Sequence, residues 1–260
     1  LICYALSFSE LSLKILGIAI LTAGFIQLLL NFFVVFYLGV LPKLTFYFDR
    51  TTLKSFFNKF IPAIFAAGVY QLNVLVDTIF ASFLVTGSPT WLYLSERLIQ
   101  FPLGLFGVAV ALVSLPNLTE LFLKNEMKQI SSLSFKILGV LISMGIGFFL
   151  GAYFLGDVII QLLFKRGEFT FFDVEMTYLA LQGYAISLVF LLPQKYFNSL
   201  FFAISKTSMV LTTGALALII NLILNYYFIF ELDLGHYGLA LATSVSSIVV
   251  FCVSIFWLFK

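Results

Sequence analysis

The sequence predicts an all-α polytopic membrane protein, that is, a bundle of helices crossing a lipid bilayer. Of its 260 residues, 62% are hydrophobic and only 10% are charged, whereas about 25% of the residues in a soluble domain are charged. The apolar residues come in long runs, and about 20 of them suffice for a helix to cross the hydrocarbon core. The formal net charge of +2 gives no reason to expect nucleic acid as a partner.

We expect seven full transmembrane helices, preceded by the tail of another at residues 1–8. The apolar runs cover residues 13–38, 60–85, 91–115, 137–163, 174–203, 209–230 and 237–259. The chain opens without an initiator Met, a basic segment or a small-residue cleavage site, so we expect it to begin inside a helix rather than with a signal peptide. Residues 41–59 mix basic residues with Phe and Tyr, which is typical of an amphipathic segment on the cytoplasmic membrane surface.

The basic residues predict the orientation. Nine of the 14 Lys and Arg residues fall in loops on one side and three on the other, so the side with nine is placed in the cytoplasm. The turn TGSPT at residues 86–90 then faces outward, as does the charged turn at residues 162–170. His236 also falls in an outer loop, where we expect it to be solvated. The remaining two basic residues, Arg97 and Lys195, lie within spans.

The most informative of these is Arg97, because an arginine inside an apolar span costs several kcal/mol and is rarely without function. Glu96, Arg97 and Gln100 project from nearly one side of a helix. The planar guanidinium suits a phosphate group. We therefore expect Arg97 to bind a substrate anion, with Glu96 and Gln100 tuning the contact. The alternative is that Arg97 pairs with an acid and holds helices together, or extends its charge to the surface.

A second polar set is predicted to hold a coupling cation. Asn73 and Asp77 are four residues apart in one span, Asn221 and Asn225 repeat this spacing in a later one, and Thr243 lies in the last span. If these helices meet, a carboxylate, amide oxygens and a hydroxyl could bind Na⁺, because hard cations take oxygen ligands. We expect Na⁺ or H⁺ at this site and no other metal or cofactor. The alternative is interhelical hydrogen bonding by the amides and the hydroxyl.

Lys195 is a further candidate for substrate binding. It follows Pro193, so a kink at the proline would turn the ammonium toward a cavity. The alternative is that the side chain extends to the cytoplasmic surface. The sequence has no Gly-rich phosphate loop, HExxH motif or Ser/His/Asp set, so we expect a membrane transporter rather than an enzyme.

Two motifs carry a family resemblance. The first has an aromatic residue, an acid and Arg-Leu, followed by P-x-G-x-x-G-x-A and L-P-x-L. It is formed by Tyr93, Glu96, Arg97, Leu98, Pro102, Gly104, Gly107, Ala109, Leu115, Pro116 and Leu118. The second is FKRGEFTFFD at residues 164–173. Both resemble the MurJ/MviN family of lipid II flippases, within the MOP exporter superfamily.

The resemblance implies a MATE-like fold of about fourteen helices in two lobes. These residues would hold the end of the fifth helix through the twelfth. Residues 1–40 would end the first lobe, residues 41–59 would link the lobes, and residues 60–260 would form the second, six-helix lobe. The sequence departs from many members at Gln100, where some have an acid, and near Ser208, where many have Thr-Pro.

The resemblance also implies a function in peptidoglycan biosynthesis and cell shape. The family moves lipid II, an undecaprenyl-diphosphate-linked precursor, from the inner to the outer leaflet of the bacterial inner (cytoplasmic) membrane by alternating access. Arg97 falls on the family's cavity arginine, which is expected to meet the diphosphate. The implied partners are lipid II, the bilayer and other cell-wall synthesis proteins.

Two other functions stay open from the sequence. A cation-coupled exporter of drugs, or a flippase for another polysaccharide lipid, would make Asp77 central and Arg97 structural. A membrane scaffold for the cell-wall machinery is the third hypothesis, and the cost of a buried arginine and carboxylate disfavours it.

Overall fold

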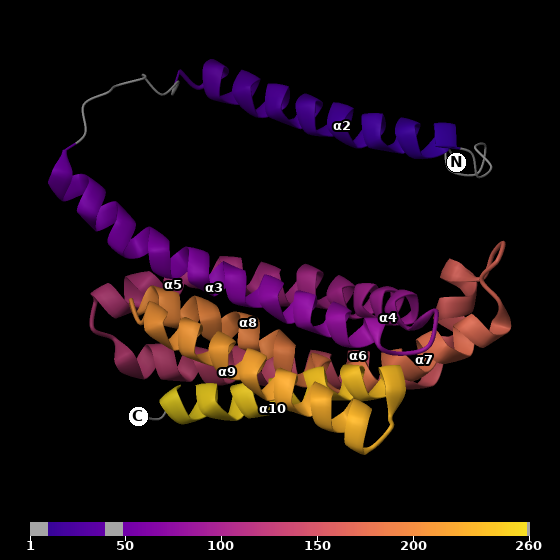
Figure 1. Ribbon diagram of the computed structural model, residues 1–260. Coiled ribbons are helices and arrows are strands. Elements are labelled where there is room, and N and C mark those ends of the chain that lie inside the picture. Colours follow the sequence, from indigo (N-terminus) through magenta and orange to yellow (C-terminus); the bar gives the residue numbers. More distant parts are fainter. Residues whose placement is uncertain (1–9, 40–48, 259–260) are drawn as a thin grey trace. The chain divides into compact units, whose positions relative to one another are not determined.

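The computed structural model describes residues 10–39 and 49–258, and every regular element in these ranges is a helix (Figure 1). In chain order the elements are α2 (Glu10–Tyr37), α3 (Arg50–Ser82), α4 (Ser88–Pro102), the π-helix η1 (Leu103–Val108), α5 (Ala109–Leu123), α6 (Met127–Phe164), α7 (Phe171–Ala185), α8 (Leu188–Ala203), α9 (Thr207–Tyr226), the π-helix η2 (Tyr227–Glu231) and α10 (Gly235–Leu258). The all-α prediction is confirmed.

The chain divides into two compact units, Leu1–Lys54 and Ser55–Lys260. The first contains α2, a single apolar helix of 28 residues. The second contains most of α3 and all of the later helices, which run side by side as a bundle (Figure 1). The boundary falls within residues 41–59, the predicted linker. The assignment of residues 1–40 and 60–260 to two lobes stays a prediction.

Five of the described helical segments are long and apolar enough to cross a membrane. A sixth span results if α7 and α8, which are bent by 50° at their junction, count as one. The seventh predicted span, residues 60–85, corresponds to most of α3, which is not among these six. From Arg50 to Ser82, α3 is one helix that includes part of the expected surface segment, because no glycine or proline lies between Arg50 and Phe60.

The longest apolar segment, Ser88–Leu123, is a helix with a local change of winding. It contains α4, η1 and α5, and η1 begins directly after Pro102. A proline cannot donate the backbone hydrogen bond of its turn, so a change to wider winding is expected at such a position. The predicted span of residues 91–115 is therefore the middle of a longer helix.

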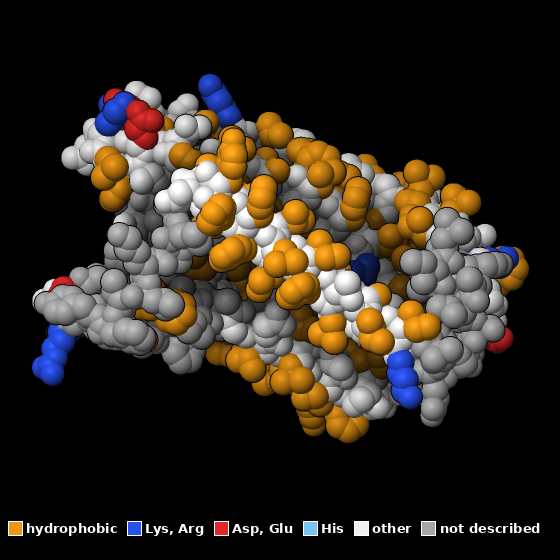
Figure 2. Space-filling model, turned by 90° about the horizontal axis from the view of Figure 1, so that it is seen from above, with side chains coloured by type: hydrophobic (Ala, Val, Ile, Leu, Met, Phe, Trp, Pro, Cys, Tyr) orange, Lys and Arg blue, Asp and Glu red, His pale blue; other side chains and the backbone are white. Residues whose placement is uncertain are grey.

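The second unit has two buried clusters and a hydrophobic exterior. One cluster surrounds Leu181 and Ala240, and the other surrounds Tyr196 and Phe197. Many large hydrophobic side chains of both units are nevertheless exposed, and hydrophobic side chains are numerous among the coloured residues in Figure 2. Such a surface suits lipid contact, because a bilayer imposes no cost on exposed apolar side chains.

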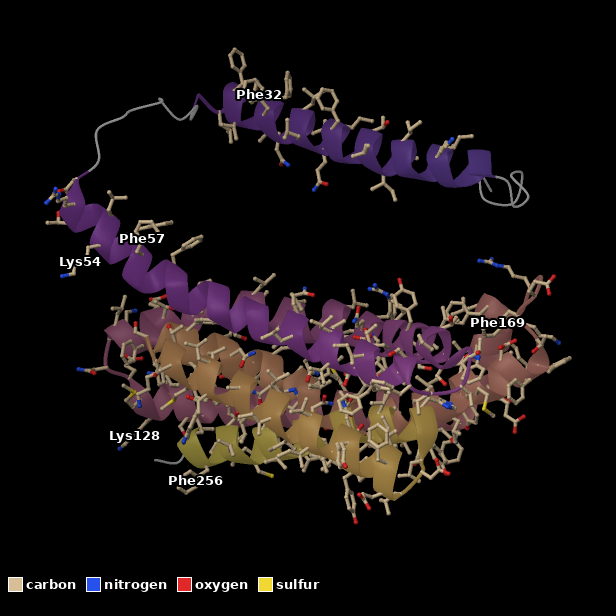
Figure 3. The ribbon with its side chains drawn as sticks, in the orientation of Figure 1. Phe32, Lys54, Phe57, Lys128, Phe169 and Phe256 are labelled. Carbon is tan, nitrogen blue, oxygen red and sulfur yellow. The ribbon has the colours of Figure 1, made fainter. Side chains whose placement is uncertain are left out.

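The two ends of α6 lie far apart in the second unit. Figure 3 shows Lys128, at the start of α6, far from Phe169, in the turn that follows it. By the predicted orientation, the Lys128 end faces the cytoplasm and the Phe169 end faces outward. The turn after α6 ends in a helix cap at Thr170, whose hydroxyl accepts a bond from the Asp173 backbone while Asp173 accepts from the Thr170 backbone.

Candidate functional site

The predicted cation-binding residues come from three helices, and the structure connects four of them by hydrogen bonds. Asn225 Nδ2 on α9 donates to Asp77 Oδ1 on α3 at 2.6 Å and to Asn221 Oδ1 at 2.9 Å. Asn221 Nδ2 donates to Thr243 Oγ1 on α10 at 3.2 Å. Asn221 and Asn225 face the same way because they are four residues apart on one helix. We call these four residues the Asp77 cluster.

Two amide oxygens near the cluster have no hydrogen-bond donor. Asn225 Oδ1 and Asn73 Oδ1 are both buried without a partner among the described residues. A buried polar atom without a partner costs about 1–3 kcal/mol. Together with the Asp77 carboxylate, these oxygens are the donor type that Na⁺ prefers. Among the described residues, no three His, Cys, Asp or Glu side chains lie together so that they could hold a metal ion.

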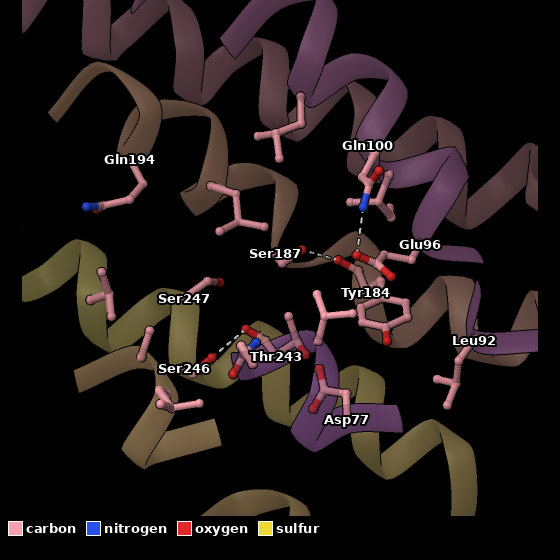
Figure 4. Close-up of a pocket in the computed structure, with 18 of the residues that line it drawn as sticks. Asp77, Leu92, Glu96, Gln100, Tyr184, Ser187, Gln194, Thr243, Ser246 and Ser247 are labelled. Carbon is pink, nitrogen blue, oxygen red and sulfur yellow. Dashed lines mark hydrogen bonds between the residues drawn. The ribbon is translucent and has the colours of Figure 1, made fainter. Parts of the chain in front are cut away.

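A cavity of about 770 Å³ lies within the second unit, lined by residues of α3, α4, η1 and α7 to α10. Asp77, Asn73 and Thr243 line it, as do Glu96 and Gln100 on α4. Figure 4 shows Asp77 and Glu96 in this cavity, with Tyr184 of α7 beside them. The cavity therefore brings together residues from both predicted sites.

Arg97 is placed differently from its neighbours. Its side chain is exposed and is not among those that line the cavity. Arg97 Nη1 donates to Gln100 Oε1 at 3.0 Å, and the guanidinium lies 4.7 Å from the centre of the Tyr93 ring. Gln100 Nε2 in turn donates to Glu96 Oε1 at 2.7 Å (Figure 4). Arg97 thus contacts Glu96 through Gln100 rather than in a direct ion pair.

Lys195 lines the same cavity, on α8. The expected kink at Pro193 stays a prediction; the bend that the structure shows lies between α7 and α8, where Ile186 and Ser187 separate the two helices. Hydroxyl groups replace lost helical bonds at this break. Ser187 Oγ donates to Tyr184 O at 2.6 Å, and Ser244 Oγ of α10 donates to Gly183 O at 2.6 Å.

Close packing against α6 fixes this break. A Cβ on Gly145 would lie 2.7 Å from Val189 Cα and 2.9 Å from Leu188 O, which are backbone atoms. Only glycine permits so close an approach without a backbone shift. The bend in turn places Tyr184 and Ser187 on the cavity wall.

Sequence reasoning missed a second polar chain on the wall that carries Lys195. Gln194 Nε2 donates to Asn198 Oδ1 at 3.3 Å, and Ser254 Oγ of α10 donates to Gln194 Oε1 at 3.1 Å. Gln194 and Asn198 both line the cavity. Their spacing of four residues was the available signal, the same one that identified Asn221 and Asn225.

The prediction for His236 is wrong. Its side chain is only 7% exposed, and its Nε2 lies 2.9 Å from Met176 O on α7. Its ring lies 5.1 Å from the ring of Trp91, measured between centres. Trp91 Nε1 donates to Asp173 Oδ1 at 2.9 Å. Trp91, two residues before the first sequence motif, thus contacts Asp173 of the second motif, and these contacts join α4, α7 and α10 at the end of the bundle predicted to face outward.

Comparison with known proteins identifies the family. The family model described as "Lipid II flippase MurJ" matches residues 2–260. A "probable lipid II flippase MurJ" from Vibrio cholerae serotype O1 is 34% identical over 232 residues, which cover 89% of this chain and 44% of that protein. A protein of the same name from Buchnera aphidicola subsp. Acyrthosiphon pisum is 30% identical over 243 residues, covering 92% and 47%.

Solved structures agree with this result. A lipid II flippase MurJ in an inward closed conformation matches with a TM-score of 0.71 and 27% identity, over 86% of this chain and 47% of that one. An outward-facing MATE multidrug transporter of the MOP superfamily matches with a TM-score of 0.68 and 18% identity, over 76% and 43%, which shows a shared fold alone. This chain spans about half the length of the curated relatives it matches. It is a multi-pass membrane protein and belongs to the MurJ family of lipid II flippases.

Proposed function

We propose that the protein containing this chain moves lipid II from the inner to the outer leaflet of the bacterial inner membrane by alternating access. The names of its relatives suggest the substrate. The observation in this chain that best supports the proposal is the exposed Arg97 within the apolar segment Ser88–Leu123. Arg97 lies nine residues after the start of this segment, or about 14 Å along the helix. An arginine within an apolar membrane segment is costly unless it meets an anion or water.

The diphosphate of the lipid fits this position. A guanidinium has five N–H donors in one plane, and the bond to Gln100 uses Nη1. Phe101, which is 71% exposed, lies on the same stretch of helix. In the proposed complex Arg97 binds the diphosphate, Glu96 and Gln100 orient the guanidinium, and Lys195 supplies a second positive charge from the cavity. The polyprenyl chain stays in the lipid.

The Asp77 cluster supports coupling of this movement to a cation. The Asp77 carboxylate, the Asn225 oxygen and the oxygen of Asn73, one turn away on α3, are the donors proposed for Na⁺, and H⁺ could occupy the carboxylate instead. A gradient of either ion, or the membrane potential, could drive reorientation, since moving one charge through 100 mV supplies about 2.3 kcal/mol. Asp77→Asn is expected to lower flipping and to remove its dependence on Na⁺ or pH. Unaltered flipping with unaltered ion dependence would exclude coupling at Asp77, and Asp157→Asn on α6 is the control.

Complementation tests the role of Arg97. The complete natural chain, including any residues beyond these 260, replaces the resident flippase in cells, and lipid II in the outer leaflet is measured. Arg97→Ala is expected to abolish growth. Arg97→Lys is expected to restore it only in part, because an ammonium lacks the two-pronged geometry. Arg166→Ala, in the exposed turn after α6, is the matched control. Normal growth and normal outer-leaflet lipid II in both Arg97 variants would exclude the assigned role.

The same cells distinguish the alternative functions. A drug exporter or a flippase for another polysaccharide lipid would leave outer-leaflet lipid II unchanged when the protein is depleted. A scaffold would lose partner localisation without losing flipping.

A further inference from the structure

Three side chains of α4 connect the cavity with the exterior of the second unit. Glu96 and Gln100 line the cavity, whereas Arg97 is exposed and lies outside it. They form one continuous chain of hydrogen bonds, with 3.0 Å from Arg97 Nη1 to Gln100 Oε1 and 2.7 Å from Gln100 Nε2 to Glu96 Oε1. The Gln100 amide joins the two ends, because its NH₂ group faces the carboxylate and its carbonyl faces the guanidinium.

The cavity end of this chain shares its space with the Asp77 cluster. Glu96 and Asp77 line the same cavity (Figure 4). Charges inside an apolar bundle interact over longer distances than charges in water and are screened less by salt. A cation bound at Asp77 therefore attracts the Glu96 carboxylate and competes with Gln100 for it.

We infer that Glu96 couples the two sites: cation binding at the Asp77 cluster draws the Glu96 carboxylate away from Gln100, and this releases Arg97 to bind an anion. When Glu96 holds the amide, the Gln100 carbonyl holds the guanidinium on α4, next to Tyr93. When the amide is free to turn, the guanidinium loses this acceptor and can face a diphosphate. Glu96 is a positioning residue in this scheme, since it acts on the anion only through Gln100 and Arg97.

The inference rests on the proposed function, because it takes the Asp77 cluster as a cation site and Arg97 as an anion site. The new claim is that Glu96 connects these two sites. Thermodynamic coupling is reciprocal, so Na⁺ must raise the affinity for the anion by the same factor as the anion raises the affinity for Na⁺. Coupling between protein sites commonly amounts to a factor of about 5 to 150.

The test measures farnesyl diphosphate binding to the complete natural chain in nanodiscs of neutral lipid, with either NaCl or choline chloride. For the wild-type protein, Na⁺ is expected to lower the Kd about fivefold or more. Glu96→Gln keeps the shape and the hydrogen bond to Gln100 but removes the charge, so its ratio of the two Kd values should approach 1. Gln100→Leu removes the link itself and should give the same result. Glu120→Gln is the matched control, because that carboxylate pairs with Lys124 and does not line the cavity.

Three other results would overturn the inference. If Glu96→Gln and Gln100→Leu keep the wild-type ratio of Kd values, the proposed link through Glu96 is wrong. If Arg97→Ala loses diphosphate binding in that case, the proposal that Arg97 binds the anion still holds. If wild-type protein binds the diphosphate equally well in both salts, the sites are not coupled. If it binds no diphosphate at all, the proposed function fails at Arg97 and the inference fails with it. The stabilisation of each variant by Na⁺ in thermal unfolding verifies that its cation site is folded.

Discussion

The Asp77 cluster makes a sharp prediction for Asn225→Asp. Asn225 is fully buried, and its Nδ2 donates to the Asp77 and Asn221 oxygens at 2.6 and 2.9 Å. The substitution changes little in size, but it replaces this donor with a carboxylate oxygen. Two carboxylates then face each other where a hydrogen bond had been.

The cost follows from the geometry. Two unit charges about 4 Å apart repel by about 4 kcal/mol at an effective dielectric constant of 20. The loss of the two bonds that Nδ2 donates adds about 1 kcal/mol each. The total of about 6 kcal/mol is comparable to the whole stability of many proteins, about 5–15 kcal/mol. A Na⁺ ion between the carboxylates would reverse most of this cost.

Thermal unfolding of the complete natural chain in detergent at pH 8 is the assay, with NaCl compared with choline chloride. Na⁺ at 100 times its Kd is expected to stabilise the wild-type protein by about 2.7 kcal/mol. The Asn225→Asp variant should be much less stable in choline and gain more than the wild type from Na⁺. Asn225→Leu, whose side chain has neither a charge nor an amide at this position, should not be stabilised by Na⁺. Equal midpoints for Asn225→Asp in the two salts would refute a cation site at Asp77.

Two further predictions concern the framework around the cavity. Gly145→Ala is expected to destabilise the bundle by about 1–3 kcal/mol, because the added Cβ would meet Val189 Cα at 2.7 Å. Gly147→Ala is its control, since nothing lies within 4 Å of a Cβ there, and equal thermal midpoints would show that α6 and α8 are not so close. Trp91→Phe removes the bond to Asp173 and is expected to cost about 1 kcal/mol. A double-mutant cycle with Asp173→Ala, which has no acceptor, measures this coupling, and strictly additive effects would contradict it.

The helices were predictable because their signal is compositional and local. Runs of apolar residues located the spans, and the four-residue spacing of Asn221 and Asn225 placed both amides on one face of α9. From the sequence, the meeting of Asp77 with these amides was only a condition for a cation site, and the hydrogen bond from Asn225 to Asp77 meets that condition. The roles of these residues in binding a cation stay a prediction.

The features that were missed depend on contacts between distant segments. His236 follows a loop sequence, and its burial results from the Met176 carbonyl and the Trp91 ring, which belong to α7 and α4. The bend between α7 and α8 lies at Ile186 and Ser187, where Ser244 and the close approach of Gly145 stabilise it. Such contacts have no signature in the local sequence.

Arg97 shows a different limit. Its presence in an apolar span was evident from the sequence. Whether its side chain faces the cavity or the exterior depends on how α4 packs against α7 and α10. The structure exposes it and directs Glu96 and Gln100 into the cavity. The three residues expected on one side of the helix therefore lie in two places, Glu96 and Gln100 in the cavity and Arg97 outside it, and hydrogen bonds connect them.

The central claim is that a protein containing this chain moves a diphosphate-linked lipid across a bilayer. The most direct measurement is the translocation rate of fluorescent lipid II in liposomes reconstituted with the complete natural chain. We predict a rate well above that of protein-free liposomes for the wild type and for Arg166→Ala, and a rate near the protein-free value for Arg97→Ala. A wild-type rate equal to that of protein-free liposomes would contradict the account.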